Sequence, residues 1–322
     1  MNTAYTTALK ALKSLYGKID ANASNFGRNW KIMPAKEYAN DLIYGVITGE
    51  GPAMIARLGS NELTCMVNYL GVHFRDRYKS VKGYVSGKTP PWWWNGSVLT
   101  QMQTGAGFFP ADARHAEKFC ELMIASIPQI DVLGSWLKEE SFFDRELSGS
   151  KKVMLEDLEP FFCKNPWTRA LEGKKVLIVH PFDQTIRLQF QKRRQLFDNN
   201  LLPDFDLTTI KAVQSIAKEK TRFQSWFEAL EFMKGEISRH EFDICILGCG
   251  AYGLPLAAFI KQMGKKAVHL GGVTQLLFGI KGRRWENYIV YPYTNLYNEH
   301  WVRPGAAEKP ENASIVEGAC YW

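Results

Sequence analysis

Two hydrophobic periodicities alternate through the second half of the chain. Short runs of consecutive apolar residues, typical of strands buried on both faces, are separated by segments whose apolar residues recur at helical spacing. The predicted strands are 174–180, 205–213, 243–247, 266–270 and 288–291, and the predicted helices are 185–198, 223–240 and 254–263. This alternation predicts an α/β, Rossmann-like fold, with a mostly parallel sheet and helices on both faces.

The first half of the chain carries fewer periodic signals. Residues 5–19 have apolar positions at helical spacing, with Lys10, Lys13 and Lys18 on the other side, which predicts an amphipathic helix. We expect this helix to dock on the protein's own body, with contact with a membrane surface as the alternative. Strands are expected at 53–56 and 130–134, and helices from Leu63 onward and over 116–127 after an N-capping Asp112.

These elements divide the chain into three parts. We expect an N-terminal amphipathic helix within residues 1–30, a single α/β domain over 31–300 and a C-terminal tail over 301–322. The domain is expected to have lobes of about 31–165 and 170–300, and residues 303–322 are expected to wrap the surface.

Composition limits the setting of the protein. With 322 residues, 46% of them hydrophobic, the chain is long enough for a large core. Six cysteines without zinc or CxxC spacing predict reduced, mostly buried thiols. No apolar run has the length of a signal-peptide core or a membrane span. We therefore expect a cytoplasmic protein, with peripheral contact at the inner face of the cell membrane as an alternative.

The net charge of +7 favours an anionic partner. The basic runs 192–194 and 281–284 are more typical of solvated faces than of binding sites. Nucleic acid is not expected as a partner, because the consecutive tryptophans at 92–94 lack adjacent lysine or arginine.

The turn after the apolar run 53–56 is the most informative feature. It brings Arg57, Gly59, Ser60, Asn61 and Glu62 to a junction of strand and helix. Ligands bind at the carboxyl ends of parallel strands, a helix N-terminus favours an anion, and a guanidinium suits a phosphate. The alternative is a purely structural turn, in which Gly59 or Ser60 caps the helix and Glu62 complements its dipole.

A second turn of this kind carries a glycine pattern. Gly248, Gly250 and Gly253 match G-x-G-x-x-G between a predicted strand and a predicted helix, which favours a phosphate site. The next strand ends at His269 without the acidic residue that would hold the ribose of NAD, so the phosphate of another nucleotide is favoured. Alternatively, the glycines serve only the turn and the packing of the helix.

Other candidates come from the same predicted rim. His180 and His269 lie at the carboxyl ends of strands, although a single histidine is more often structural, and Tyr252 is expected to line the same site. At least one tryptophan of the run 92–94, with Trp93 as the candidate, is expected to stack on a ligand. The chain has no nucleophile elbow, Walker loop, HExxH or zinc set, which excludes the commonest hydrolases, kinases and metalloproteases.

Residues 55–62, Ile-Ala-Arg-Leu-Gly-Ser-Asn-Glu, resemble the Arg-x-Gly-x-x-Glu fingerprint of bacterial GT-D fold glycosyltransferases. The blocks 176–182 and 248–285 look like proteins of capsule and other surface-polysaccharide gene clusters. The resemblance implies a Rossmann-like sheet that binds a nucleotide-sugar and transfers the sugar to a glycan or lipid-linked glycan acceptor. Gln275 and Arg284, in the last block, join the substrate-binding candidates.

The family loop carries Asp-x-Glu, whose carboxylates hold a divalent metal against the diphosphate. Here Ser60 stands at the aspartate position, so Mg²⁺ or Mn²⁺ would have Glu62 as its one carboxylate ligand, with phosphates and waters completing the shell. Alternatively, Arg57 and Arg284 neutralise the leaving diphosphate without a metal.

The first expectation is therefore a glycosyltransferase in which Glu62 is a metal ligand or the base that deprotonates the acceptor, with His180 and His269 in the catalytic site. Two alternatives stay open. The glycine pattern fits an NAD(P)-dependent oxidoreductase, and the same turns fit a non-catalytic nucleotide-binding subunit of a polysaccharide assembly complex.

Overall fold

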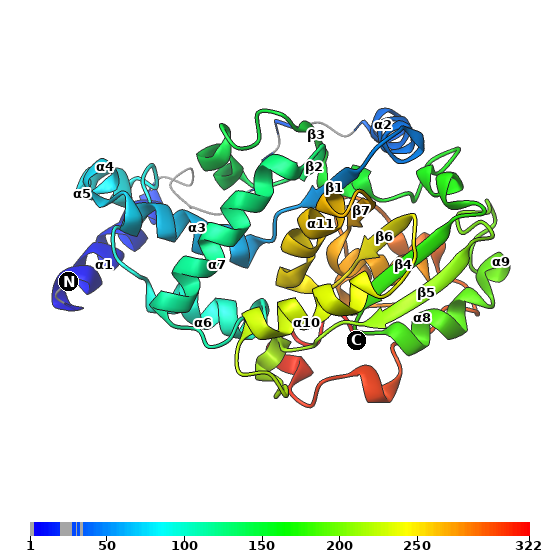
Figure 1. Ribbon diagram of the computed structural model, residues 1–322. Helices are drawn as coiled ribbons and strands as arrows, with labels where there is room; N and C mark the ends of the chain where they lie inside the picture. The colour runs from blue at the N-terminus through cyan, green and yellow to red at the C-terminus, as the bar shows by residue number, and fades with distance from the viewer. Residues whose placement is uncertain (1–2, 20–27, 30, 33–34) are drawn as a thin grey trace.

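A computed structural model describes residues 3–19, 28–29, 31–32 and 35–322, so the expected segment 1–30 is described only in part. At its centre is one sheet of seven parallel strands in the order β3-β2-β1-β7-β6-β4-β5 (Figure 1). The strands are β1 (Ala53–Arg57), β2 (Val132–Ser135), β3 (Lys151–Met154), β4 (Lys175–His180), β5 (Asp206–Lys211), β6 (Ile244–Leu247) and β7 (Lys266–His269). Strands from both expected lobes belong to this sheet, because β7 pairs with β1.

Successive residues of each strand face opposite sides, so each strand fills two cores. In β6, Ile244 and Ile246 lie in one hydrophobic cluster, and Cys245 and Leu247 lie in the other. Burial on both sides explains the continuous apolar runs of the strands in the sequence. The Rossmann-like α/β prediction is confirmed.

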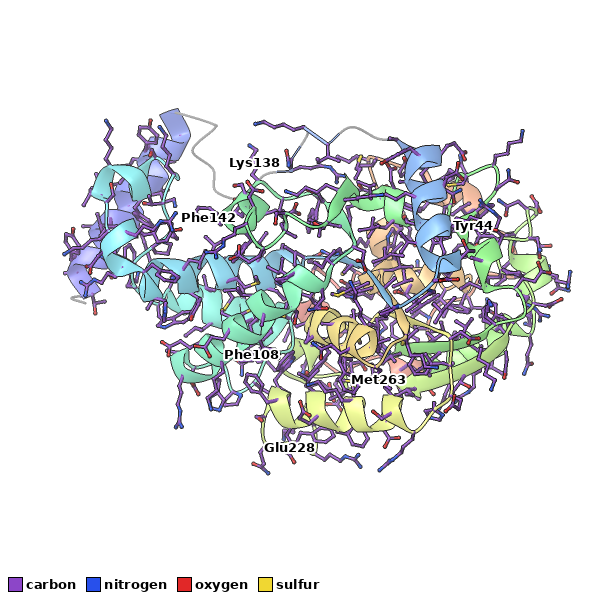
Figure 2. All side chains as sticks on the ribbon, turned by 45° about the horizontal axis from the view of Figure 1, so that its top comes forward. Tyr44, Phe108, Lys138, Phe142, Glu228 and Met263 are labelled. Atoms are coloured by element: carbon purple, nitrogen blue, oxygen red, sulfur yellow. The ribbon has the colours of Figure 1, made fainter. Side chains whose placement is uncertain are left out.

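Helices cover both faces of the sheet. On one face lie α3 (Ser60–His73), α6 (Gly96–Gly105), α7 (Ala113–Ser126), α10 (Trp226–Ser238) and α11 (Gly253–Gln262). On the other lie α2 (Lys36–Thr48), α8 (Asp183–Phe190), α9 (Arg193–Leu196) and α12 (Thr274–Leu277). The remaining helices, α1 (Thr3–Ile19), α4 (Arg75–Tyr78) and α5 (Val81–Val85), gather at one end of the molecule, as Figures 1 and 2 both show.

Three local predictions need correction. The helix expected over 185–198 is divided into α8 and α9, because the backbone leaves the helical conformation at Lys192. β3 was not predicted, because only two of its four residues are buried. No strand forms over 288–291: the tyrosines of this segment donate hydrogen bonds to buried carboxylates instead, Tyr288 to Glu156 (2.6 Å) and Tyr291 to Asp157 (2.8 Å).

The segment 303–322 does not simply wrap the surface. Val316, Cys320 and Trp322 are buried in the cluster beneath α8 and α12. The polar composition of this segment suggested a surface position. Burial of its apolar side chains favours packing against the core instead.

The six cysteines are buried and free, as the sequence predicted. Within the described residues, no helix is both long enough and apolar enough to cross a membrane.

A candidate active site at the carboxyl edge of the sheet

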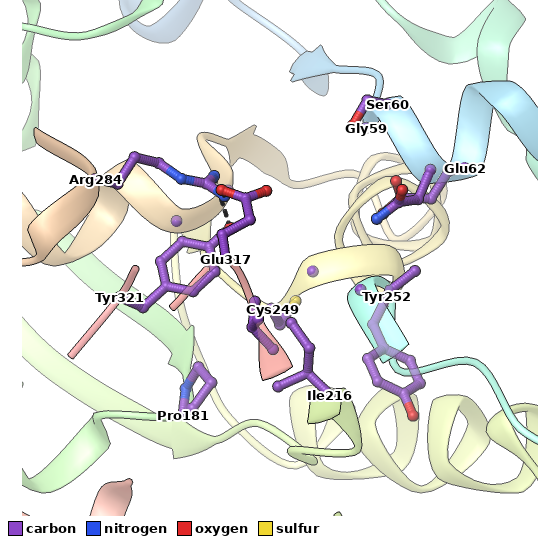
Figure 3. A pocket seen from close by; sticks show the side chains of 18 of the residues that line it. Gly59, Ser60, Glu62, Pro181, Ile216, Cys249, Tyr252, Arg284, Glu317 and Tyr321 are labelled. Carbon is purple, nitrogen blue, oxygen red and sulfur yellow. Dashed lines mark hydrogen bonds and ion pairs between the residues drawn. The ribbon is translucent and has the colours of Figure 1, made fainter. Parts of the chain in front are cut away.

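A cavity of about 600 Å³ lies at the carboxyl ends of the strands (Figure 3). Each of the seven strands contributes a residue within two positions of its end, namely Gly59, Trp136, Leu155, Pro181, Val213, Gly248 and Gly271. This is the edge at which open parallel sheets bind ligands. The carboxyl ends of the strands therefore meet at one edge of the sheet, as expected from the sequence, and they surround a cavity.

Arg57 is the last residue of β1 and lies in the wall of the cavity. Its Nη2 donates to the carbonyl oxygen of Leu58 (3.0 Å), and its guanidinium lies 5.2 Å from the centre of the Trp136 ring. Its Nε is buried and has no hydrogen-bond partner among the described residues. A buried donor without a partner costs free energy of folding. Arg57 Nε is therefore available to donate a hydrogen bond to a ligand acceptor such as a phosphate oxygen.

Glu62 lies in the first turn of α3 and folds back over Gly59, where a Cβ would overlap its carboxylate. Burial raises the pKa of Glu62 above its usual value, and the nearby charge of Arg57 offsets this only in part. Ser60 lies beside it in the cavity wall, and Asn61 packs against Gly105 of α6. The arginine turn, residues 57–62, thus presents a cation and a carboxylate together.

His180, the last residue of β4, is buried in the cavity wall. Burial lowers its pKa to about 3, so the ring is neutral. Its Nδ1 accepts a hydrogen bond from the backbone N–H of Phe182 (3.0 Å), which leaves the ring proton on Nε2. The ring lies against Gly248, where a Cβ would overlap it.

His269, the last residue of β7, is buried in the same cavity wall, but its Nδ1 is a donor rather than an acceptor. Burial, helped by the charge of Arg57, lowers its pKa to about 3. Its Nδ1 lies 3.4 Å from the carbonyl oxygen of Leu247, to which it donates. The ring lies directly against Gly253, the first residue of α11, where a Cβ would overlap it. Two glycines of the glycine turn, residues 248–253, are therefore required by imidazole packing.

Gly250 and Tyr252 complete the glycine turn. Gly250 has a φ of 57°, and a Cβ there would meet no atom within 4 Å, so its backbone is open to a ligand. The Tyr252 ring stacks on Trp226 at 4.9 Å between ring centres, and its hydroxyl lies 3.0 Å from Ser215 Oγ. Tyr252 lines the cavity but points away from Glu62 in Figure 3.

Arg284 lies across the cavity from Glu62 (Figure 3). Its guanidinium donates to Tyr321 Oη (2.8 Å) and to Glu317 Oε2 (2.7 Å), so its charge is already partly compensated. Gln275 is fully buried in the same wall, and its Nε2 donates to the backbone carbonyls of Ile280, Lys281 and Tyr321. Gln275 Oε1 has no partner among the described residues.

Trp93 lies away from the cavity. Trp92 and Trp93 are buried beside Tyr84 and Leu9, with ring centres 4.9 Å apart between Trp93 and Tyr84. From the sequence we expected that three tryptophans in one loop could not all be buried. In the structure, α1 supplies an additional apolar surface, and the rings of Trp92 and Trp93 pack beside its Leu9. The expected stacking of Trp93 on a ligand is therefore not supported at this cavity.

The sequence analysis missed many of the lining residues, among them Trp136, Tyr288, Glu317 and Tyr321. Trp136 lies two residues after the predicted strand 130–134 and directly after β2, so the sequence carried a signal for its position at the rim. Tyr288, Glu317 and Tyr321 come from irregular segments, whose place depends on long-range packing that no local periodicity encodes.

The donor set at the arginine turn is sparse for a divalent cation. Glu62 and Ser60 offer one carboxylate and one hydroxyl, whereas Mg²⁺ and Mn²⁺ prefer several oxygens in near-octahedral geometry. Among the described residues, no three histidine, cysteine, aspartate or glutamate side chains converge on a common point. The residues do not form a metal cage, so we derive no step through a metal.

Comparisons with known proteins add no assignment to this geometry: no family model, no curated protein and no solved structure matches the chain.

Proposed function

We propose that the chain is a glycosyltransferase that moves a sugar from a nucleotide-sugar to a surface-polysaccharide acceptor, as the resemblance of residues 55–62 to GT-D enzymes implies. The observation that carries the proposal is the arginine turn. A guanidinium with an unpartnered buried nitrogen and a carboxylate of raised pKa face one cavity of about 600 Å³. That volume lies within the range of small-molecule sites.

In the proposed reaction the acceptor oxygen attacks the anomeric carbon of the donor, and the bond from that carbon to the diphosphate oxygen breaks. Glu62 takes the proton of the acceptor hydroxyl, and its raised pKa makes it a better base than an exposed glutamate. Arg57 and Arg284 stabilise the negative charge that develops on the leaving diphosphate. The neutral His180 contributes a hydrogen-bond donor at Nε2 without adding charge.

The acceptor is a glycan or a lipid-linked glycan, and we assign the reaction to the cytoplasm, where nucleotide-sugars are the activated donors. The open backbone at Gly250 supports a place for one phosphate at the glycine turn. The packing of His180 and His269 on the other two glycines gives them a structural use, so the glycine pattern alone lends the oxidoreductase alternative little support.

The test is a thermal-shift screen with nucleoside diphosphates, nucleotide-sugars and NAD(P)H, because a ligand that binds only the folded state raises its melting temperature. We expect a nucleoside diphosphate to stabilise the wild type, and Arg57→Gln to weaken its binding roughly 10- to 100-fold through loss of a charge-assisted hydrogen bond. Arg114→Gln, an exposed change on α7, serves as the control.

Each alternative has its own outcome in this screen. Stabilisation by NAD(P)H alone would overturn the proposal in favour of an oxidoreductase. Binding of nucleotide-sugars without any sugar transfer to capsule-type acceptors would favour a non-catalytic subunit.

A further inference from the structure

Helix α1 docks on the protein through a narrow edge. Leu9 is its one fully buried apolar side chain among the described residues, and it packs with Tyr84, Trp92 and Trp93. Beside it, Lys13 Nζ lies 4.3 Å from the centre of the Tyr84 ring. Lys10 Nζ donates to Asn95 Oδ1 (2.8 Å). These contacts fix the orientation of the helix.

This orientation leaves the apolar stripe of α1 in solvent. Tyr5, Leu12, Leu15 and Tyr16 are between 36% and 58% exposed. At 3.6 residues per turn these four side chains fall within an arc of roughly 100°, the width of a stripe that ordinarily faces a core. Helix α1 is amphipathic, as predicted from the sequence, but the rest of the protein does not cover its apolar face.

Residues 74–81, at the same end of the molecule as α1 (Figure 1), carry further exposed apolar side chains. Phe74 and Val81 are 49% and 46% exposed. Of the eleven exposed large apolar side chains in the described chain, six therefore lie on α1 or in residues 74–81. Monomeric proteins seldom gather exposed apolar side chains at one place without a binding purpose.

This end of the molecule is also strongly basic. Helix α1 contains no acidic residue, and residues 74–89 contain one, Asp76. Seven exposed basic side chains take part in none of the ion pairs of the described residues: Lys10, Lys18, Arg75, Arg77, Lys79, Lys82 and Lys88. We call residues 3–18 and 74–89 together the basic end; it lies at one extremity of the molecule in Figures 1 and 2.

The basic end also contains an open cavity of about 590 Å³ between α1 and residues 80–89. Lys82 and Lys88 line it together with the hydroxyl residues Ser80, Ser86 and Thr89. Thr89 Oγ1 is buried without a partner among the described residues. Ammonium and hydroxyl groups around a cavity of this size suit the phosphate of a lipid headgroup.

We propose that the basic end binds a bilayer that contains anionic phospholipid. The apolar stripe of α1 enters the interface between headgroups and acyl chains, the basic side chains meet the anionic headgroups, and the cavity beside Lys82 and Lys88 receives one headgroup phosphate. A second copy of the chain is a poorer partner for this surface, because it would bring two sets of seven cations together. The proposal is independent of the proposed sugar transfer.

The test is co-sedimentation of the full chain with vesicles of equal parts phosphatidylglycerol and phosphatidylcholine, and with vesicles of phosphatidylcholine alone. We expect binding to the anionic vesicles that weakens as salt is raised. The double variant Lys82→Glu, Lys88→Glu should weaken binding at least about tenfold, and Leu12→Ser, Leu15→Ser should do the same.

Matched controls lie near the opposite end of the molecule, around β4 and α8. Lys174→Glu with Lys192→Glu reverses two exposed charges there, and Leu188→Ser replaces an exposed leucine of α8. Both should leave vesicle binding within about twofold of the wild type. Equal binding to neutral vesicles, or equal losses in the controls, would overturn the proposal. A concentration-dependent dimer that Leu12→Ser, Leu15→Ser abolishes, without vesicle binding, would assign the stripe to a second copy instead.

Discussion

The arginine turn and the glycine turn are built on the same plan and use their residues differently. Both connect a buried parallel strand to a helix at one edge of the sheet. At the glycine turn, the rings of His180 and His269 occupy the space beside Gly248 and Gly253. These two glycines therefore accommodate side chains of the protein itself rather than a ligand. At the arginine turn, Arg57 Nε has no hydrogen-bond partner among the described residues, and burial destabilises the charged form of the Glu62 carboxylate; both residues line the cavity.

The difference shows that a match to a sequence motif does not by itself establish a binding site. Glycine spacing reports where backbone or side chains come close, and the close neighbour can be a protein group as well as a ligand. A buried polar group without a partner is a more direct sign of an absent ligand, because folding alone gains nothing by leaving it unpaired.

The largest expected effect would test the arginine turn through Glu62→Gln. If Glu62 takes the acceptor proton, the rate of sugar transfer should fall by roughly 10²- to 10⁴-fold, since the amide cannot act as a base. The melting temperature should stay near that of the wild type or rise, because burial already disfavours the charged carboxylate. Turnover and melting temperature are measured on one preparation. Near-normal turnover would return Glu62 to the role of a helix-dipole partner.

Acid should destabilise the protein through His180, the buried histidine that packs on Gly248. The pKa of His180 is about 3 in the folded state against a usual 6.5, so the unfolded chain binds more protons in this window. The free energy of unfolding should therefore fall as the pH drops from 6.5 towards 3, by about 2 kcal/mol for this residue at pH 5. His180→Gln should flatten the slope, measured by urea unfolding at several pH values. The exposed His240→Gln should not; equal slopes in all three proteins would contradict burial of a neutral His180.

Two glycine substitutions separate packing from backbone strain. Gly253→Ala should lower the free energy of unfolding by about 1–3 kcal/mol, because its methyl group overlaps the ring of His269. Gly250→Ala should lower it by about 1 kcal/mol, since the positive φ strains any L-residue while the space around it is free. In a His269→Ala background the effect of Gly253→Ala should largely vanish. An undiminished effect would show that the ring is not what Gly253 accommodates.

The smallest effect is expected from removal of divalent cations. With one carboxylate and one hydroxyl at the arginine turn, chelator should lower turnover by no more than about twofold. Complete loss that Mg²⁺ or Mn²⁺ restores would mean that substrate phosphates and other side chains complete a metal shell there, and Arg57 and Arg284 would lose their role as the principal counter-charges.

The sequence predicted the strands that build the site better than the segments that close it. β1, β4, β6 and β7 are apolar runs because both faces of each strand are buried, and the four rim residues Arg57, His180, Gly248 and His269 follow from their ends. Glu317 and Tyr321 had no comparable signal, since they reach the cavity through irregular backbone. The segment 288–291 looked like a strand because tyrosine favours strands, and only tertiary structure reveals the carboxylates that bind its hydroxyls.

The position of β7 has a consequence for biosynthesis. It is the last strand of the described sheet to be translated, and it joins β1 to β6: Ala53 and Ile244 both align with Lys266. Until the ribosome has released residues 266–269, the strands can form only two separate groups, β1–β3 and β4–β6. Such distant pairing is slow to form. A nascent chain therefore carries the arginine turn, at residues 57–62, for about 200 residues of synthesis before β7 can join it to the glycine turn on one rim.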